Sequence, residues 1–170
     1  EGKTVGIVGT GNIGLRTAEK FLAMGCKVVG WNRTRRPEFE SLGAAYRSTV
    51  EDVFREADVV SLHLAANRET YHVVNDRVLE NAKRNLILIN VARGDLVDTA
   101  ALVRALKDGR LGGAGIDVYE EEPVRGTGRS KDPSLDELEL MDLPGRRSHE
   151  YFPELSSDGK WLVWAATQRG

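Results

Sequence analysis

The fold is decided by residues 3–14, which read Lys3-Thr-Val-Gly-Ile-Val-Gly-Thr-Gly-Asn-Ile-Gly14. Apolar residues at positions 5, 7 and 8 form a short run that ends at a glycine, which predicts a buried strand rather than a helix. Gly9, Gly11 and Gly14 follow with the spacing Gly-x-Gly-x-x-Gly, and an amphipathic segment over residues 12–24 comes directly after them. This stretch therefore predicts a strand, a glycine turn and a helix in direct succession.

Each of the three glycines has a different physical role in such a turn. Gly9 allows the tight change of direction, Gly11 lets a pyrophosphate approach the backbone, and Gly14 lets the helix pack on the strand. The free N–H groups and the positive dipole end of the following helix favour phosphate. Glycine-rich turns also produce this spacing by chance. Between a strand and a helix, however, the pattern predicts dinucleotide binding.

Size and composition set the limits. The 170 residues are 41% hydrophobic and 29% charged, which fits one globular domain, or one domain and a piece of another. The formal net charge of −2 gives no field that would recruit nucleic acid or a membrane. A single cysteine, Cys26, excludes an internal disulfide and favours a core residue in a reducing, cytoplasmic compartment. The sequence suggests no membrane span and no metal site, and its start at Glu1 suggests a piece of a longer protein.

Further strands and helices alternate along the chain. We expect strands at residues 27–31, 58–64, 86–91 and 113–119, the third of them covered on both faces. A capping box at Ser48-x-x-Glu51 should open a helix through Phe54, and Asp98 should cap a helix over 100–107 that ends at Gly109. The alternation predicts an α/β fold with a doubly wound parallel sheet of Rossmann type. The segment around Asp158-Gly159 predicts a short C-terminal β-hairpin.

The end of the second strand bears on the choice of cofactor. Folds that bind NAD usually carry an acidic residue there, about 20 residues after the glycines. Here the chain reads Asn32-Arg-Thr-Arg-Arg-Pro37. Asn32, Thr34 and the guanidinium of Arg33 can bind a 2′-phosphate that a carboxylate would repel. We therefore favour NADP over NAD; the alternative is a solvated basic loop.

Four blocks together resemble one family. They are residues 2–14, the run Ala57-Asp-Val-Val-Ser-Leu-His-Leu64, the run Asn90-Val-Ala-Arg-Gly-Asp-Leu-Val-Asp98, and the run Gly115-Ile-Asp-Val-Tyr-Glu-Glu-Glu-Pro123. In this order they look like the cofactor domain of the D-isomer-specific 2-hydroxyacid dehydrogenases. The resemblance covers about the first 123 residues. It departs from the family after Leu64, where Ala-Ala-Asn replaces the usual proline.

The resemblance implies site residues. Arg93 matches the arginine that holds the substrate carboxylate and polarises its carbonyl. Asp117 matches a residue that binds the nicotinamide amide, and Glu122 matches the carboxylate that pairs with the catalytic histidine and raises its pKa. The motifs place the cofactor on Gly9, Gly11, Asn12, Ile13, Gly14, Asn32, Arg33, Thr34, Val91, Ala92 and Asp117.

The catalytic histidine is the weak point of the resemblance. Relatives carry it in a Pro-His pair after a short strand, and this chain has no such pair. His149 lies at a comparable distance, within Arg-Ser-His-Glu-Tyr-Phe, and is the candidate acid/base. We expect His63, inside a strand, and His72, in a helix-like segment, to be structural.

The C-terminal residues suggest a different origin. We expect a cofactor domain over 1–124 without the family's substrate domain, a linker over 125–135, and a separate segment over 136–170. Tyr151-Phe-Pro-Glu-Leu-Ser-Ser-Asp-Gly-Lys-Trp-Leu-Val-Trp164 looks like a blade repeat of the TolB-type β-propellers. One blade cannot bury both its faces without neighbouring blades. The alternative is a divergent C-terminus of the same dehydrogenase family.

The expected function is that of an oxidoreductase. The resemblance implies hydride transfer between NAD(P)H and a small 2-keto or 2-hydroxy acid such as glyoxylate or hydroxypyruvate, in a homodimer joined through the cofactor domain. Two alternatives remain: a dinucleotide-binding module without turnover, and a fused or truncated product whose propeller-like tail binds a partner.

Overall fold

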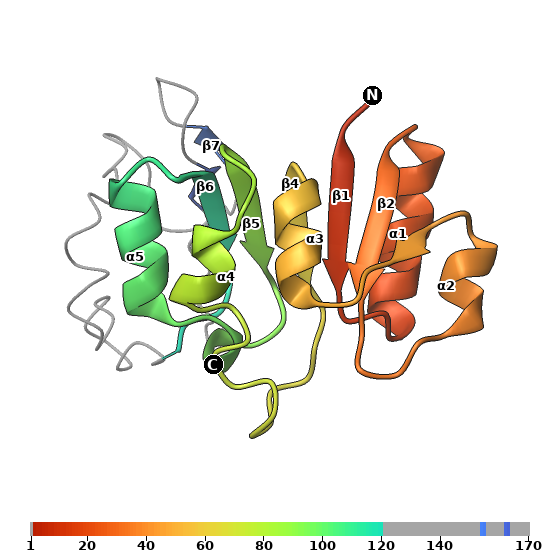
Figure 1. Cartoon of the computed structure of the whole chain (residues 1–170), viewed down its shortest axis with the longest axis horizontal. Helices are drawn as coiled ribbons and strands as arrows, with labels where there is room; N and C mark the ends of the chain where they lie inside the picture. Colours follow the sequence, from red (N-terminus) through yellow and green to blue (C-terminus); the bar gives the residue numbers. More distant parts are fainter. Residues whose placement is uncertain (1, 121–153, 156–161, 164–170) are drawn as a thin grey trace, which may run out of the picture.

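A computed structural model describes residues 2–120, 154–155 and 162–163 of the chain (Figure 1). The described strands are β1 (Thr4–Val8), β2 (Lys27–Trp31), β3 (Ala45–Tyr46), β4 (Val59–Leu62), β5 (Leu86–Asn90), β6 (Leu111–Ile116), β7 (Glu154–Leu155) and β8 (Leu162–Val163). The described helices are α1 (Asn12–Ala23), α2 (Pro37–Ser41), α3 (Val50–Glu56), α4 (Asp76–Glu80), α5 (Thr99–Lys107) and the 3₁₀ turn η1 (Gly94–Leu96).

Six of these strands form one parallel sheet in the order β3-β2-β1-β4-β5-β6. The chain moves outward from β1 in one direction and returns to β4 to move outward in the other. This is the strand order of the doubly wound Rossmann-type fold, and it confirms the predicted fold class. β7 and β8 pair antiparallel in a separate two-stranded sheet, as a hairpin requires.

Two apolar clusters cover opposite faces of the six-stranded sheet. On one face, α1 and α2 pack on β1–β3, and Ile7 and Phe39 are completely buried between them. On the other face, α3, α4 and α5 cover the sheet, and Phe54 is completely buried against it. In Figure 1, α3 and α4 stand in front of the strands, and α5 lies to the left of β6. The alternation of apolar residues along each strand supplies both faces at once.

The alternation in β5 corrects one expectation. Leu86 and Leu88 are fully buried under α4 and α5, but Ile87 on the opposite face is 39% exposed. Within the described residues, α1 and α2 pack mainly on β1, β2 and β3 on that face. The apolar run therefore predicted the strand correctly, but the expectation that both faces of β5 are buried was wrong.

Element ends differ from the sequence expectation by a few residues. The capping box belongs to Thr49 and not to Ser48: the Thr49 hydroxyl accepts from the backbone N–H of Asp52 at 3.1 Å, and the Asp52 carboxylate accepts from the Thr49 N–H at 3.2 Å. The sequence allows a capping box at Ser48-x-x-Glu51 or at Thr49-x-x-Asp52, because aspartate can take the place of glutamate at the third helical position. Asp98 caps α5 as predicted, and its side chain accepts from Ala101 N–H at 3.0 Å.

Candidate functional site

Most of the predicted site residues lie at one edge of the sheet. The carboxyl ends of all six parallel strands meet there, at the lower edge in Figure 1. β1 and β4 are neighbours, and the chain leaves them in opposite directions. Such a switch point is where open α/β sheets bind their ligands, because the loops on its two sides diverge.

The glycine turn after β1 has the close contacts that its sequence predicts. Gly9 has a φ of +100°, a left-handed conformation, and a Cβ there would lie 2.6 Å from the backbone carbon of His63. A Cβ on Gly14 would lie 2.0 Å from the carbonyl oxygen of Gly9. Both positions therefore require glycine for the packing of the protein itself.

Gly11 is different. Its φ is −67°, an ordinary value, and a Cβ there would meet no atom within 4 Å. Neither conformation nor packing within the described chain requires a glycine at this position. A requirement does arise if a ligand lies against the backbone, which is the role of the second glycine in a dinucleotide turn.

The first turn of α1 suits an anion. Gly11 is its N-cap and supplies no side-chain hydrogen bond, and the first turn carries no acidic residue. The N–H groups of this 12-residue helix are therefore available at its positive dipole end. Arg36 brings a further positive charge, because its guanidinium donates to the Asn12 side-chain oxygen at 3.1 Å. Ile13 is 71% exposed beside them.

The end of β2 lies next to this turn, and the Gly9 N–H donates to the Trp31 carbonyl at 2.9 Å. The Asn32 amide donates to the Thr34 carbonyl at 2.7 Å and fixes the loop. The Arg33 guanidinium is exposed and forms an ion pair with Glu69, from the loop after β4. The predicted basic loop is therefore at the right edge of the sheet, with a carboxylate that its own sequence did not reveal.

Arg93 lies at the same edge, three residues beyond the end of β5. Its guanidinium is exposed and donates to the Ala92 carbonyl at 2.6 Å. The buried side chain of Asn90 organises this loop, since it donates to the Arg93 carbonyl at 2.8 Å and accepts from the Ala92 N–H at 3.1 Å. Val91, on the same loop, is 50% exposed.

Asp117 is fixed to the same loop. Its N–H donates to the Asn90 carbonyl at 3.0 Å, and its side chain is exposed at the end of β6. A Cβ on Gly94 would lie 1.9 Å from the carbonyl oxygen of Tyr119, so the segment after β6 packs directly on the Arg93 loop. The structure therefore brings Arg93 and Asp117 together through backbone contacts.

A cluster around Glu120 was not predicted. One Glu120 oxygen lies 2.5 Å from His72 Nε2, and the other accepts from the Thr99 hydroxyl at 2.9 Å and the Thr99 N–H at 3.3 Å. Tyr71 stacks on His72 and donates its hydroxyl to Glu120 at 3.3 Å. Burial acts to raise the pKa of Glu120, but the bonds from His72 and Thr99 outweigh it and leave the pKa below its usual value.

The two described histidines correct and extend the sequence reading. His72 is not helical: it lies in a turn with φ +49°, and it holds the Glu120 cluster. His63 comes directly after β4, its Nε2 lies 3.0 Å from the Ser61 hydroxyl, and burial lowers its pKa. Both side chains thus have hydrogen-bond partners within the described chain. Glu122 and His149 lie outside the described residues.

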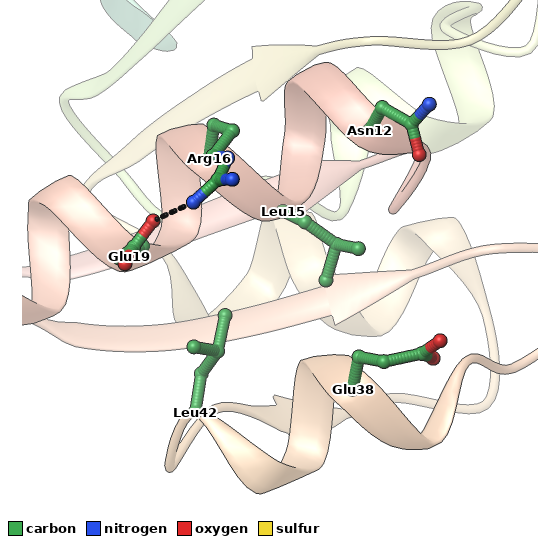
Figure 2. Close-up of a pocket in the computed structure, with 6 residues that line it drawn as sticks. All are labelled: Asn12, Leu15, Arg16, Glu19, Glu38 and Leu42. Atoms are coloured by element: carbon green, nitrogen blue, oxygen red, sulfur yellow. Dashed lines mark hydrogen bonds and ion pairs between the residues drawn. The ribbon is translucent and has the colours of Figure 1, made fainter.

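A separate groove lies between α1 and α2. It has a volume of about 460 Å³ and is lined by Asn12, Leu15, Arg16, Glu19, Glu38 and Leu42. Figure 2 shows these side chains along the two helices, with the Arg16–Glu19 ion pair on α1. Because most of it follows the length of α1 and not the strand ends, it is distinct from the edge that carries Arg93.

The part of the chain that the structure describes has neither a metal-binding cluster nor a membrane-spanning helix. No three His, Cys, Asp or Glu side chains gather there in a way that would hold a metal ion. None of its helices is long and apolar enough to cross a bilayer.

The residues at this edge fit a dinucleotide. Gly11 leaves open space over its backbone, the first turn of α1 offers free N–H groups, and Ile13 and Val91 expose apolar surface. Phosphates suit the first two features, and flat rings suit the third.

Comparison with known protein families shows which family this chain belongs to. The model of the D-isomer specific 2-hydroxyacid dehydrogenase, NAD binding domain, matches residues 1–142. The chain belongs to this family. The predicted resemblance over the first 123 residues is confirmed, and the match continues beyond the boundary expected at residue 124.

Individual relatives agree with the family. A glyoxylate reductase from Thermococcus litoralis is 48% identical over 124 residues, 72% of this chain and 37% of that protein. A D-lactate dehydrogenase from Staphylococcus epidermidis is 36% identical over 140 residues, 82% of this chain and 42% of that protein. The chain thus spans well under half the length of these curated relatives.

A solved structure extends the likeness to the fold. The D-isomer specific 2-hydroxyacid dehydrogenase from Lactobacillus delbrueckii ssp. bulgaricus, in its NAD complexed form, superposes with a TM-score of 0.76 at 34% identity. The match covers 95% of this chain and 45% of that one. A family that binds a nicotinamide dinucleotide is therefore established; no comparison bears on the propeller resemblance.

Proposed function

We propose that the protein is an oxidoreductase that transfers a hydride between NAD(P)H and a small 2-keto or 2-hydroxy acid, similar to glyoxylate or hydroxypyruvate. Gly11 carries this proposal, because neither conformation nor packing within the described chain requires a glycine there, whereas a bound pyrophosphate does. Membership of the dehydrogenase family supports the reaction type. Glyoxylate reductase and D-lactate dehydrogenase are the activities named for the relatives described above.

The dinucleotide is proposed to lie along the carboxyl edge from β2 to β6. Its phosphates would accept from the first turn of α1, and its nicotinamide would lie near the Arg93 loop. The proposed cofactor contacts are Gly9, Gly11, Asn12, Ile13, Gly14, Asn32, Arg33, Thr34, Val91, Ala92 and Asp117.

Three residues are proposed for the chemistry. The exposed guanidinium of Arg93 would hold the substrate carboxylate and stabilise the negative charge that develops on the carbonyl oxygen. Glu122 would pair with the acid/base and keep it protonated, and His149 is the candidate that gives the proton to that oxygen. When bound, the nicotinamide supplies or accepts the hydride.

NADP is the preferred cofactor in this proposal. The support is the absence of an acid in Asn32–Thr34 and the exposed guanidinium of Arg33. Arg33→Ala together with Arg35→Ala should weaken NADPH more than NADH, since a bond to a charged group contributes about 1.5–3 kcal/mol, or about tenfold or more. Equal losses for the two cofactors would remove the preference.

Turnover tests the proposal as a whole. Glyoxylate and hydroxypyruvate are offered with NADPH or NADH, and the loss of absorbance of the reduced cofactor is followed. We expect reduction above background that is lost in Arg93→Ala. Dinucleotide binding without any turnover in the full-length protein would instead make it a binding module.

The remaining proposals concern organisation. We propose a cytoplasmic homodimer joined through the cofactor domain of residues 1–124, a linker over 125–135, and a propeller-like segment over 136–170. The antiparallel pairing of β7 with β8 supports a distinct C-terminal segment. If deletion of 136–170 leaves oligomeric state and solubility unchanged, that segment has no role in association.

A further inference from the structure

We propose that Glu69 is a specificity-determining residue that restrains the binding of NADP by holding the Arg33 guanidinium. The proposal rests on the proposed function, because it needs a dinucleotide at the glycine turn. It assigns a role to a residue outside the Asn32–Thr34 loop that the sequence alone singles out.

The positions of the two residues span the switch point. Arg33 lies two residues beyond the end of β2, and Glu69 lies in the loop that follows β4. β1 is paired with β2 on one side and with β4 on the other. The ion pair from Arg33 Nη1 to Glu69 Oε2 therefore connects the two strands that flank β1 and its glycine turn.

Both partners are supplied by loops with internal hydrogen bonds. The Asn67 side-chain oxygen accepts from the N–H groups of Glu69 and Thr70 at 2.9 and 3.1 Å, and the Thr70 hydroxyl donates to the Ala65 carbonyl at 2.7 Å. On the other side, the Asn32 amide donates to the Thr34 carbonyl. The backbone of each loop is thus fixed, and the two side chains meet from defined positions.

The other arginines of the loop have different partners. The Arg35 guanidinium lies 5.4 Å from the centre of the Tyr46 ring, and Arg36 contacts Asn12 at 3.1 Å and Glu38 at 3.6 Å. Glu69 is therefore the carboxylate that occupies Arg33, the arginine nearest to the end of β2. A 2′-phosphate that binds Arg33 has to displace it.

The chemistry of the two cofactors makes this displacement selective. The ribose of NAD carries hydroxyl groups, which donate hydrogen bonds and tolerate a carboxylate nearby. The 2′-phosphate of NADP is repelled by a carboxylate and competes with it for the guanidinium. Glu69 thus supplies, from the loop after β4, the acidic group that the end of β2 lacks.

The ion pair is exposed, with 74% of the Arg33 side chain and 66% of the Glu69 side chain accessible. Its contribution to stability is therefore small, and its removal should leave the fold intact. A variant at Glu69 can for this reason be compared with wild type in binding experiments.

The test measures the dissociation constants of NADPH and NADH by calorimetry for the full chain and for Glu69→Gln. We expect Glu69→Gln to bind NADPH about threefold to tenfold more tightly, with little change or a loss for NADH. In 0.5 M NaCl the gain should shrink, because salt screens exposed charges.

Two matched variants separate the ion pair from net charge. Glu38→Gln removes an exposed carboxylate from the same region, and it should give a smaller gain for NADPH. In an Arg33→Ala background, Glu69→Gln should give little or no gain. An equal gain in Glu38→Gln, an undiminished gain without Arg33, or no gain at all would overturn the proposal.

The outcomes also distinguish this inference from the proposed function. If wild type binds NADH or NADPH and Glu69→Gln shifts neither, the role of Glu69 fails while the dinucleotide site stands. If wild type binds neither cofactor, both fail.

Discussion

The Nε2 atom of His72 lies 2.5 Å from a carboxylate oxygen of Glu120, a residue 48 positions further along the chain. The same carboxylate accepts from Thr99 at the start of α5. One charged group therefore connects three segments: the loop after β4, the start of α5 and the segment after β6. That last segment begins at Asp117, so the cluster fixes the chain next to the proposed nicotinamide end of the site.

Glu120→Gln should destabilise the fold. The substitution keeps the shape of the side chain but removes its charge, and hydrogen bonds to charged groups are stronger than neutral ones. For this partly exposed group we expect a loss of about 1–2 kcal/mol in the free energy of unfolding, measured by urea denaturation at pH 7. Glu80→Gln, which removes an exposed carboxylate 3.9 Å from Arg110, should change stability little.

The effect of Glu120→Gln should depend on pH in a defined direction. Hydrogen bonds from His72 and Thr99 overcome the effect of burial and leave the pKa of Glu120 below its usual value. The stabilisation by the charge is therefore present above the ordinary glutamate pKa of about 4.3 and is lost as the pH falls below it. If the difference in the free energy of unfolding between wild type and Glu120→Gln stayed constant down to the pH of acid unfolding, the charge of Glu120 would not be the cause of that difference.

His63 should give the free energy of unfolding a second dependence on pH, at a higher pH than Glu120 does. Burial lowers the pKa of His63 in the folded protein, so the unfolded chain binds this proton first, near pH 6.5. Stability should fall as the pH decreases from about 6.5 to the folded-state pKa, by at most about 1.4 kcal/mol per pH unit. His63→Gln should lack this slope in urea denaturation, whereas Ser61→Ala, which keeps the imidazole, should retain it. Parallel curves for wild type and His63→Gln would contradict the assignment.

Asn90→Leu should damage the Arg93 loop. It leaves the part-buried Ala92 N–H and Arg93 carbonyl without their side-chain partner, and each such group costs up to about 1–3 kcal/mol. We expect a large fall in the urea midpoint together with a faster amide hydrogen exchange at residues 91–94. The comparison is Asn81→Leu, an exposed residue whose amide donates to the Arg77 carbonyl at 2.8 Å. A similar midpoint for the two variants would mean that water replaces the Asn90 contacts.

The sequence was sufficient where a local pattern had one physical solution. The apolar run that ends at Gly9 predicted the first strand and its turn, and Gly9 does adopt a left-handed conformation. The alternation of strands and helices along the chain predicted the parallel sheet. Arg93 was expected after a strand, and it does lie at the carboxyl edge of the sheet. Asp117 was expected inside a strand over 113–119, but β6 ends at Ile116 and Asp117 lies just beyond it.

The sequence was insufficient where the partner is distant. Glu120 is the first of three consecutive acidic residues in the sequence, and only the fold shows that His72 and Thr99 contact it. The Glu69–Arg33 ion pair joins positions 36 residues apart, and no local pattern predicts which arginine a distant carboxylate will contact. Asn90 did leave a signal, since an amide that ends a buried apolar strand needs hydrogen-bond partners.

The proposed dinucleotide site is best tested by a calorimetric titration of NADH and NADPH into the full chain and into Gly11→Val. Because a Cβ at Gly11 meets no atom of the described chain within 4 Å, the variant should fold, with a modest fall in the urea midpoint because valine is a poorer N-cap than glycine. We expect saturable binding by the wild-type chain and a loss of about tenfold or more in Gly11→Val, since one lost pyrophosphate contact of about 1.4 kcal/mol is a tenfold change. No binding of either cofactor at millimolar concentration, or equal binding by the two proteins, would contradict it.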